Sequence, residues 1–262
     1  MIIKAIKTRI FFPPKDDLFS LIKESFSNLK LKEKSIIAIT SKVVAIWQGR
    51  CVKIDPKMNK DDLIKKEADF YLNRNQVPKG YVILTIKDDI LIPTAGIDES
   101  NANGYYVLWP EKPYKAAEKI YNFIKKNYNL KQFGVIITDS HCTPMRTGIM
   151  GIGIAYYGFY PLKDYRGKKD IFGRVIKISR ANIVDSLAAS AVFEMGEGAE
   201  QTPIAIIEDI NNIKFGKFDS IKSDPLKMDR DEDIYAPLIK SAKWHPSSSP
   251  AKRDTTGQEI KM

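Results

Sequence analysis

The chain has 262 residues, of which 44% are hydrophobic, so it is long enough to bury a substantial core and disorder is a poor default. Two cysteines, Cys51 and Cys142, are too few for a disulfide framework and lack the CxxC spacing of a structural zinc site, which favours a reduced cytoplasmic protein. The net charge of +10 comes from lysines scattered among acids, and no long apolar run is present. We therefore expect anionic small-molecule partners, no nucleic acid and no membrane.

The first half of the chain begins with a helical pattern. Apolar residues at helical spacing predict a helix over residues 16–29. A short apolar run over residues 35–39 predicts a strand, and it ends in Thr40-Ser41-Lys42, which suits a phosphate-facing turn. A second helix is predicted over residues 61–72.

Strand patterns follow this second helix. Residues 81–86 and 90–92 predict a hairpin that turns at Lys87-Asp88-Asp89 and ends at Pro93. Beyond it, one apolar face predicts a helix over residues 113–128.

The next elements alternate between strand and helix. Residues 133–138 predict a buried strand that ends at Asp139, and a glycine-rich stretch covers residues 148–158. We predict a strand over residues 175–178, a helix over residues 182–195 and a last strand over residues 203–207.

These elements predict an α+β fold. The hairpin interrupts the alternation of strands and helices, so mixed or antiparallel sheets with flanking helices fit better than a doubly wound sheet. One domain is expected over residues 1–243. The sequence then becomes mostly polar, and a disordered tail is expected over residues 244–262.

Several common kinds of active site do not match the sequence. No GxxxxGK[ST] phosphate loop occurs, and Gly151-Ile152-Gly153 lacks the third glycine of a dinucleotide fingerprint. A serine hydrolase would depend on His141, because the other histidine, His245, lies beside the expected tail.

Three acidic residues lie beside glycine or small polar residues, at breaks between the predicted elements: Asp98, Asp139 and Glu197. Carboxylate oxygens are hard ligands that suit Mg²⁺ or Mn²⁺ ions bridging phosphates. Each acid alone also has a structural explanation, as a cap of a turn or helix or as a solvated residue in a glycine loop.

Together these acids fall within motifs that occur in one order along the chain. The chain resembles the coenzyme F420-0:L-glutamate ligase family, including its relatives proposed to act on folate. The resemblance covers residues 9 to 202, and it is carried by residues 40–42 with 48–50, 95–101, 135–140, 164–174 and 195–198.

This resemblance implies a site with two divalent cations and a nucleotide. The metal ligands would be Asp98 and Asp139 for one Mg²⁺ or Mn²⁺ ion, and Ser140 and Glu197 for the other. GTP or ATP would bind at Arg9, Ile10, Phe11, Phe12, Ser41, Lys42, Asn101, Met195, Gly196, Glu197, Gly198, Ala199, Glu200, Gln201 and Thr202. A homodimer with intertwined sheets is also implied.

The implied reaction joins L-glutamate to a carboxylate of an F420-0-type or folate acceptor through an acyl phosphate, with Asp98, Asp139 and Glu197 as the catalytic acids. Phosphoryl transfer needs positioning and charge neutralisation rather than a nucleophilic side chain. Cations near the motifs could hold the acceptor or the glutamate, or they could simply form a solvated face: Arg146, Arg166, Lys168, Lys169 and Arg174.

Two departures from the family pattern keep alternatives open. Ile46 stands where archaeal F420 ligases have a lysine, which Lys42 could replace, and His141-Cys142-Thr143 stands where they have Asn-Gly-Arg. The second change favours a folate acceptor. A catalytically inactive nucleotide- or metabolite-binding relative and a nucleic-acid-binding protein are the alternatives to a ligase.

Overall fold

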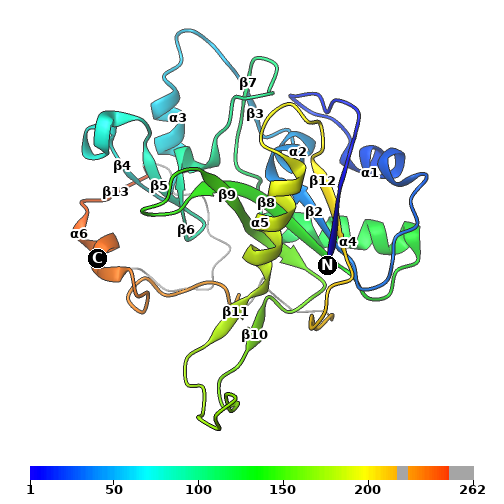
Figure 1. The fold of residues 1–262 in the computed structure, drawn as a ribbon. Helices are drawn as coiled ribbons and strands as arrows, with labels where there is room; N and C mark the ends of the chain where they lie inside the picture. Colours follow the sequence, from blue (N-terminus) through cyan, green and yellow to red (C-terminus); the bar gives the residue numbers. More distant parts are fainter. Residues whose placement is uncertain (217–223, 248–262) are drawn as a thin grey trace. The chain divides into compact units, whose positions relative to one another are not determined.

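The structure is a computed structural model that describes residues 1–216 and 224–247 (Figure 1). The chain divides into two compact units. The first consists of Met1–Lys53 and Asp98–Met228, and the second of Ile54–Ile97 and Asp229–Met262. The residues predicted to form a single domain thus belong to two compact units, each assembled from two separate segments.

A five-stranded sheet forms the centre of the first unit, in the order β1-β12-β2-β8-β9. Its strands are β1 (Ile2–Ile6), β12 (Ile204–Glu208), β2 (Ile36–Thr40), β8 (Gly134–Cys142) and β9 (Ile149–Tyr157). Only β2 and β8 are parallel, with Thr40 opposite Thr138, and the other pairs are antiparallel. This mixed sheet confirms the predicted α+β class.

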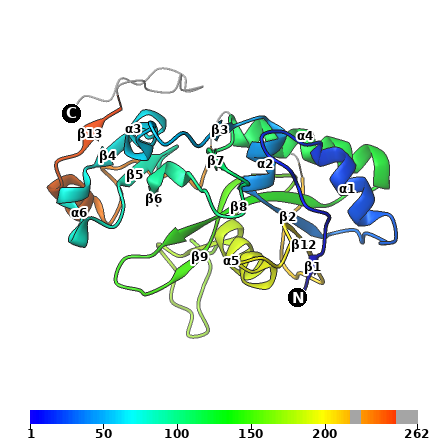
Figure 2. The ribbon, with the colours of Figure 1, turned by 90° about the horizontal axis from the view of Figure 1, so that it is seen from above.

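Helices cover both faces of this sheet (Figure 2). One face carries α1 (Leu18–Phe26), α2 (Ser41–Trp47) and α4 (Pro113–Tyr128), and the other carries α5 (Ile183–Met195). Side-chain caps start two of them, because Asp17 accepts from the amide of Phe19 and Asn182 accepts from that of Asp185. The helices predicted over residues 16–29, 113–128 and 182–195 are therefore confirmed.

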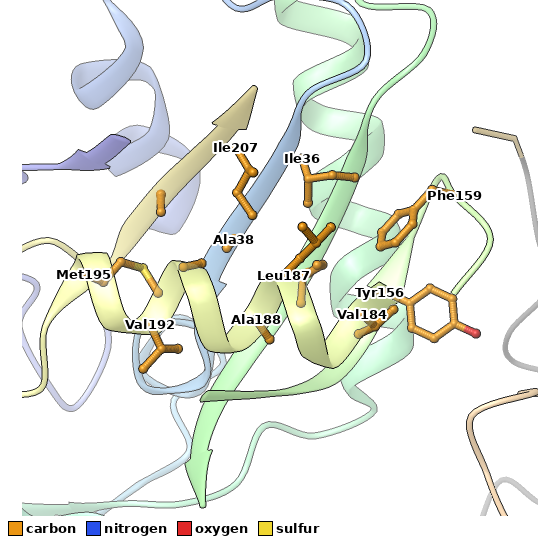
Figure 3. Packing of buried hydrophobic residues seen from close by; sticks show 13 residues of the cluster. Ile36, Ala38, Tyr156, Phe159, Val184, Leu187, Ala188, Val192, Met195 and Ile207 are labelled. Atoms are coloured by element: carbon orange, nitrogen blue, oxygen red, sulfur yellow. The ribbon is translucent and has the colours of Figure 1, made fainter. Parts of the chain in front are cut away.

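One hydrophobic core lies between α5 and the sheet (Figure 3). Val184, Leu187 and Ala188 of the helix pack against Ile36 and Ile207 of the strands. The close approach of α5 requires glycines in β9. A Cβ added to Gly151 would lie 2.6 Å from the carbonyl oxygen of Ala188. A Cβ added to Gly153 would lie 2.3 Å from Cγ1 of Val184. The glycine-rich stretch thus contains the edge strand β9, against which α5 packs.

Two small sheets complete the first unit. Strand β3 (Cys51–Lys53) pairs with β7 (Tyr105–Val107), and β10 (Leu162–Asp164) pairs with β11 (Arg180–Asn182). Residues between β10 and β11 form an arm that projects from the first unit (Figure 1). The strand predicted over residues 175–178 does not form. Val175 makes one isolated bridge to Lys169, and the regular pairing begins at Arg180.

The second unit contains a four-stranded antiparallel sheet in the order β13-β4-β5-β6. Its strands are β13 (His245–Pro246), β4 (Phe70–Leu72), β5 (Leu84–Lys87) and β6 (Ile90–Pro93), and its α-helices are α3 (Lys60–Glu67) and α6 (Ala236–Ser241). Short 3₁₀ turns cover Arg74–Gln76, Pro78–Gly80 and Thr94–Gly96. The predicted hairpin is confirmed, with Asp88 and Asp89 at positive φ in its turn.

The helix predicted over residues 61–72 is too long. It ends at Glu67 because Ala68 is extended, and Phe70, Tyr71 and Leu72 pair with β5 instead. Apolar and aromatic residues fit a pleated, half-buried surface, so strand pairing prevails over helical spacing here.

The predicted tail begins too early. Residues 244–247 belong to the fold, since the Trp244 indole donates to the Ile239 carbonyl oxygen at 2.7 Å and β13 pairs with β4. The rest of that segment, residues 248–262, lies outside the described residues. No helix in the described part of the chain is long and apolar enough to cross a membrane.

Candidate functional site

The site lies where two parallel strands end. The parallel pairing of β2 with β8 ends at Thr40 and Thr138, after which β2 passes into α2 while β8 continues beside β9, so the residues after Thr40 and Thr138 lie at the same end of the two strands. Ser41 and Lys42 begin α2 there, next to Asp139. Carboxyl ends of parallel strands commonly hold ligands because side chains from separate segments converge there.

Hydrogen bonds to Ser100 and an ion pair with Lys42 hold the Asp98 carboxylate in place. Its Oδ1 accepts from the backbone amide of Ser100 at 2.8 Å, and its Oδ2 accepts from the Ser100 hydroxyl at 3.0 Å. Lys42 Nζ lies 2.6 Å from the same Oδ2. Burial alone would raise the pKa of Asp98, but the Lys42 ammonium and the Ser100 donors outweigh it and lower that pKa.

Asp139 has one satisfied and one unsatisfied oxygen. Its Oδ1 accepts from the backbone amide of Ser140 at 2.7 Å. Its Oδ2 is buried and forms no hydrogen bond with the described residues, although the Ser41 hydroxyl lies nearby. Burial raises the pKa of Asp139 to about 6, although the Ser140 amide and the Ser41 hydroxyl oppose this, and the charge of Asp98 adds to it. A buried oxygen without a donor is suited to bind a cation.

A second pair of oxygen donors lies at the start of the loop after α5. Ser140 Oγ donates to Glu197 Oε1 at 2.6 Å. The helix ends at Gly196, whose φ of +79° favours glycine, and the chain turns there into residues 197–202. Asn101 Nδ2 donates to the Gly198 carbonyl oxygen at 2.8 Å, so this loop is tied to the segment that carries Asp98.

Of the four predicted metal ligands, Ser140 and Glu197 are in direct contact, and Asp98 lies near enough to Asp139 for its charge to raise the pKa of Asp139. Within the described ranges, no three His, Cys, Asp or Glu side chains form a metal-binding group. Mg²⁺ in phosphate-transferring sites uses one or two carboxylates together with water and substrate phosphates, so it needs no such group. The donor set, all oxygen, and the unsatisfied Asp139 Oδ2 fit ions of this kind.

The predicted nucleotide-binding residues near the N-terminus form a braced loop. The Arg9 guanidinium donates to Asp16 at 2.7 and 2.9 Å and to Glu24 of α1 at 3.0 Å, so these two carboxylates neutralise its charge. This pairing lowers the pKa of Asp16 to about 2. Phe11 is buried, whereas Ile10 and Phe12 are about half exposed. The amide of Thr8 donates to the Gln201 carbonyl oxygen, which joins this segment to the loop after α5.

The other predicted binding residues of that loop have distinct surroundings. Met195 is buried in the core, and the Thr202 hydroxyl donates to its carbonyl oxygen. Glu200 accepts from the Gly198 amide at 2.8 Å through its side chain. The loop over residues 196–202, which includes Ala199, is exposed except at Thr202. Ser41, Lys42, Asn101 and this loop therefore come together with the acidic residues.

Other residues that carry the resemblance contact the backbone. Gln48 and Glu111 are joined by two hydrogen bonds of 2.8 and 2.7 Å, and Arg50 Nε donates to the Trp109 carbonyl oxygen at 3.2 Å. These contacts hold the segment after β7 against α2. These contacts give Gln48 and Arg50 a structural role that requires no ligand.

The basic arm between β10 and β11 is exposed and organised by its own acids. Asp164 binds the Arg166 guanidinium, and Asp170 accepts from the amides of Phe172 and Arg174 at 2.9 Å each. Lys168 and Lys169 are exposed as well, as is Arg146 in the turn between β8 and β9. The structure places none of these cations in contact with the acidic pairs.

Both departures from the family pattern have clear surroundings. Ile46 is a core residue with 2% exposure, one helical turn after Lys42 in α2. His141 and Cys142 are the last residues of β8 and Thr143 follows it, and Cys142 is more exposed than Ser140. Any acceptor contact made at residues 141–143 would therefore differ from one made by an arginine.

Ser100 is a site residue that our sequence predictions missed. It supplies two donors to Asp98 and two acceptors to Lys42, whose Nζ lies 2.9 Å from its carbonyl oxygen and 3.2 Å from its hydroxyl. An aspartate followed two residues later by serine is typical of an Asx turn, so the pattern Asp98-Glu99-Ser100 contained the signal.

Comparison with known proteins gives consistent matches. The chain matches the family described as F420-0:Gamma-glutamyl ligase over residues 5–209. It is similar to the Coenzyme F420:L-glutamate ligase of Methanocaldococcus jannaschii, with 31% identity over 82% of this chain and 89% of that protein. The proteins of the same name from Methanopyrus kandleri and Methanococcus maripaludis are 32% and 34% identical, over 74% and 70% of this chain and 81% and 79% of theirs.

Proposed function

Because the chain belongs to the F420-0:gamma-glutamyl ligase family, we propose that it is a ligase that uses GTP or ATP to join L-glutamate to a carboxylate of an acceptor cofactor. The observation that carries this proposal is the convergence of Asp98, Asp139, Ser140 and Glu197 with Lys42 at one edge of the sheet. The acceptor is an F420-0-type molecule or a folate.

The proposed reaction has two steps. A carboxylate oxygen of the acceptor attacks the γ-phosphorus, the bond to the β-phosphate oxygen breaks, and an acyl phosphate and a nucleoside diphosphate form. The amine of glutamate then attacks the acyl carbon, phosphate leaves, and the amine loses its proton as the amide forms. Both steps bring anions together, so they depend on fixed positive charge and orientation.

The chain's own residues would supply this environment. We propose that Asp98 and Asp139 hold one Mg²⁺ or Mn²⁺ ion and that Ser140 and Glu197 hold a second, and such ions neutralise phosphate charge when bound. The exposed loop over residues 196–202 and the braced loop around Arg9 and Phe12 would hold the nucleotide. The Ser100 and Asn101 side chains keep the two ligand pairs in register.

Product analysis tests this function and separates the acceptors. Purified protein with Mg²⁺, glutamate and GTP or ATP is expected to release phosphate and to add the mass of one glutamyl unit to the acceptor. Since residues 141–143 lack the arginine of the F420 enzymes, we expect extension of a mono- or diglutamyl folate and poorer extension of F420-0. Efficient extension of F420-0 alone would reverse the acceptor preference. Nucleotide binding without phosphate release would indicate an inactive relative.

We also propose that the protein is a homodimer paired through β9. Among the described strands, β9 pairs only with β8, and its nine residues contain no charge or proline to protect the open edge. Ile149 and Met150 on this strand are 54% and 45% exposed. A two-fold axis could join two copies of β9 into a continuous sheet.

Light scattering at micromolar concentration tests this assembly. We expect the mass of two chains for the parent and the mass of one chain for Met150→Lys, because a lysine on an edge strand opposes pairing. A parent protein that is monomeric under these conditions would contradict the proposal. An exposed lysine added on α4 at Asn127 serves as the control and should leave the mass unchanged.

A further inference from the structure

The Lys42 ammonium is held by three oxygen atoms of the segment that carries Asp98. Its Nζ lies 2.6 Å from Asp98 Oδ2, 2.9 Å from the Ser100 carbonyl oxygen and 3.2 Å from the Ser100 hydroxyl. The side chains of Lys42 and Asp98 are 25% and 44% exposed, so water screens this pair in part. Lys42 is thus a bound cation of this segment and not a solvated surface charge.

Both oxygens of Asp98 already have donors. Oδ1 accepts from the Ser100 amide, and Oδ2 is shared by the Ser100 hydroxyl and Lys42. The hydroxyl can rotate away, but a divalent ion and an ammonium bound to one carboxylate oxygen would lie about 4 Å apart or less and repel each other. An ion that binds Asp98 at Oδ2 therefore weakens the contact of that oxygen with Lys42.

Lys42 has another group to bind once it is displaced. It begins α2, and its flexible four-carbon stem lets the ammonium move while the backbone stays in place. Its neighbour Ser41 faces Asp139, so the released ammonium remains at the same edge of the sheet. The group of opposite charge that the proposed function brings there is the phosphate chain of the nucleotide.

We propose that Lys42 and the first divalent ion compete for Asp98, so that ion binding releases Lys42 to pair with the nucleotide phosphates. This inference rests on the proposed function. It makes the ion and the nucleotide bind cooperatively, and linkage requires that each raise the affinity for the other. Ser100 is then a positioning residue that holds both competitors.

Titration calorimetry with Mn²⁺ in the absence of nucleotide tests the competition. Lys42→Met removes the ammonium and keeps the apolar stem, so it is expected to bind Mn²⁺ roughly 5- to 10-fold more tightly than the parent. In the presence of Mn²⁺, the same variant should bind nucleotide more weakly. Lys4→Met is the matched control, because Lys4 makes a similar ion pair outside the site, with its Nζ 2.8 Å from Glu208 Oε2. The Mn²⁺ affinity of Lys4→Met should equal that of the parent.

Salt separates displacement from simple repulsion. A change that reflects only long-range repulsion between Lys42 and the ion shrinks strongly between 0.1 and 0.5 M salt, whereas a contact that must be broken is screened far less. We expect the difference between Lys42→Met and the parent to persist at the higher salt concentration. Equal or weaker Mn²⁺ binding by Lys42→Met would overturn the competition.

Chemical labelling gives a second readout that needs no variant. Acetic anhydride acylates free amines, so Mg²⁺ without nucleotide is expected to increase the labelling of Lys42, measured by peptide mass spectrometry against Lys4. Unchanged labelling, with Mg²⁺ shown to be bound by calorimetry, would also overturn the competition. If the parent binds neither Mn²⁺ nor Mg²⁺, the proposed metal site itself is wrong, and this outcome is distinct from the failure of Lys42 alone.

Discussion

Asp98→Asn and Asp139→Asn are each expected to lower the rate of glutamate-dependent phosphate release by at least about 100-fold. An amide keeps the shape of the side chain and can still accept from Ser100 or Ser140, but it removes the charge that would hold a cation. Initial rates with GTP or ATP at saturating Mg²⁺ measure the effect. Because both residues are proposed to hold one ion, the double variant should be little slower than either single variant.

Stability distinguishes an ion-binding role from a capping role. With EDTA at pH 8, Asp139→Asn is expected to melt no lower than the parent. The pKa of Asp139 is raised by burial to about 6, so its carboxylate is ionised at pH 8 and costs stability in the folded protein. A large drop in melting temperature would instead support a structural role for Asp139.

A matched control is available in the second unit. Asp61 binds the Arg74 guanidinium at 2.7 and 2.8 Å, and this hydrogen bond lowers its pKa. Asp61→Asn makes the same chemical change in a residue that none of the site contacts involve. Its rate of phosphate release should remain within about twofold of the parent. An equal loss of activity in Asp61→Asn would mean that the assay reports folding and not the site.

Removal of divalent cations should abolish activity completely. All the proposed ligands are oxygen donors, and transfer of a phosphoryl group to a carboxylate brings several negative charges together, so Mg²⁺ or Mn²⁺ is expected to be essential. Excess EDTA should stop product formation, and added Mg²⁺ or Mn²⁺ should restore it. Zn²⁺ should restore less, because its preferred ligands are nitrogen and sulfur.

The variants make this chelation experiment more specific. Ser140→Ala and Glu197→Gln alter the second pair of donors, which are joined by a hydrogen bond of 2.6 Å. Each should raise the Mg²⁺ concentration needed for half-maximal activity while leaving the fold intact, because both side chains lie at least partly exposed. Full turnover by the parent in excess EDTA would exclude the two-ion mechanism.

The sequence was informative wherever structure is decided locally. Helices α1, α4 and α5 follow from apolar residues at helical spacing with a cap or a proline at the start, and the β5–β6 hairpin follows from two apolar runs around Asp88 and Asp89. The same local logic located the acids Asp98, Asp139 and Glu197, because each lies beside a small residue where a regular element breaks. These features depend on neighbours within a few residues.

Local patterns failed where a distant segment determined the outcome. Phe70, Tyr71 and Leu72 fit a helix by spacing, but pairing with β5 makes them a strand. Residues 148–158 gave no clear strand pattern, because Gly151 and Gly153 in β9 leave room for α5, which follows more than 25 residues later. Sequence spacing contains no direct measure of such an approach.

The arrangement of the candidate site also depends on contacts between distant segments. The sequence by itself determined which acidic and polar residues it contains, and the family resemblance it carries determined the reaction class. Only the tertiary structure brought these residues together, because the parallel pairing of β2 with β8 places Ser41 and Lys42 beside Asp139, almost 100 residues apart in the chain. It also decided which charges are available, since the Arg9 guanidinium is bound by Asp16 while Lys42 binds Asp98. A side chain's partner depends on contacts between distant segments, and these form only when the whole sheet assembles.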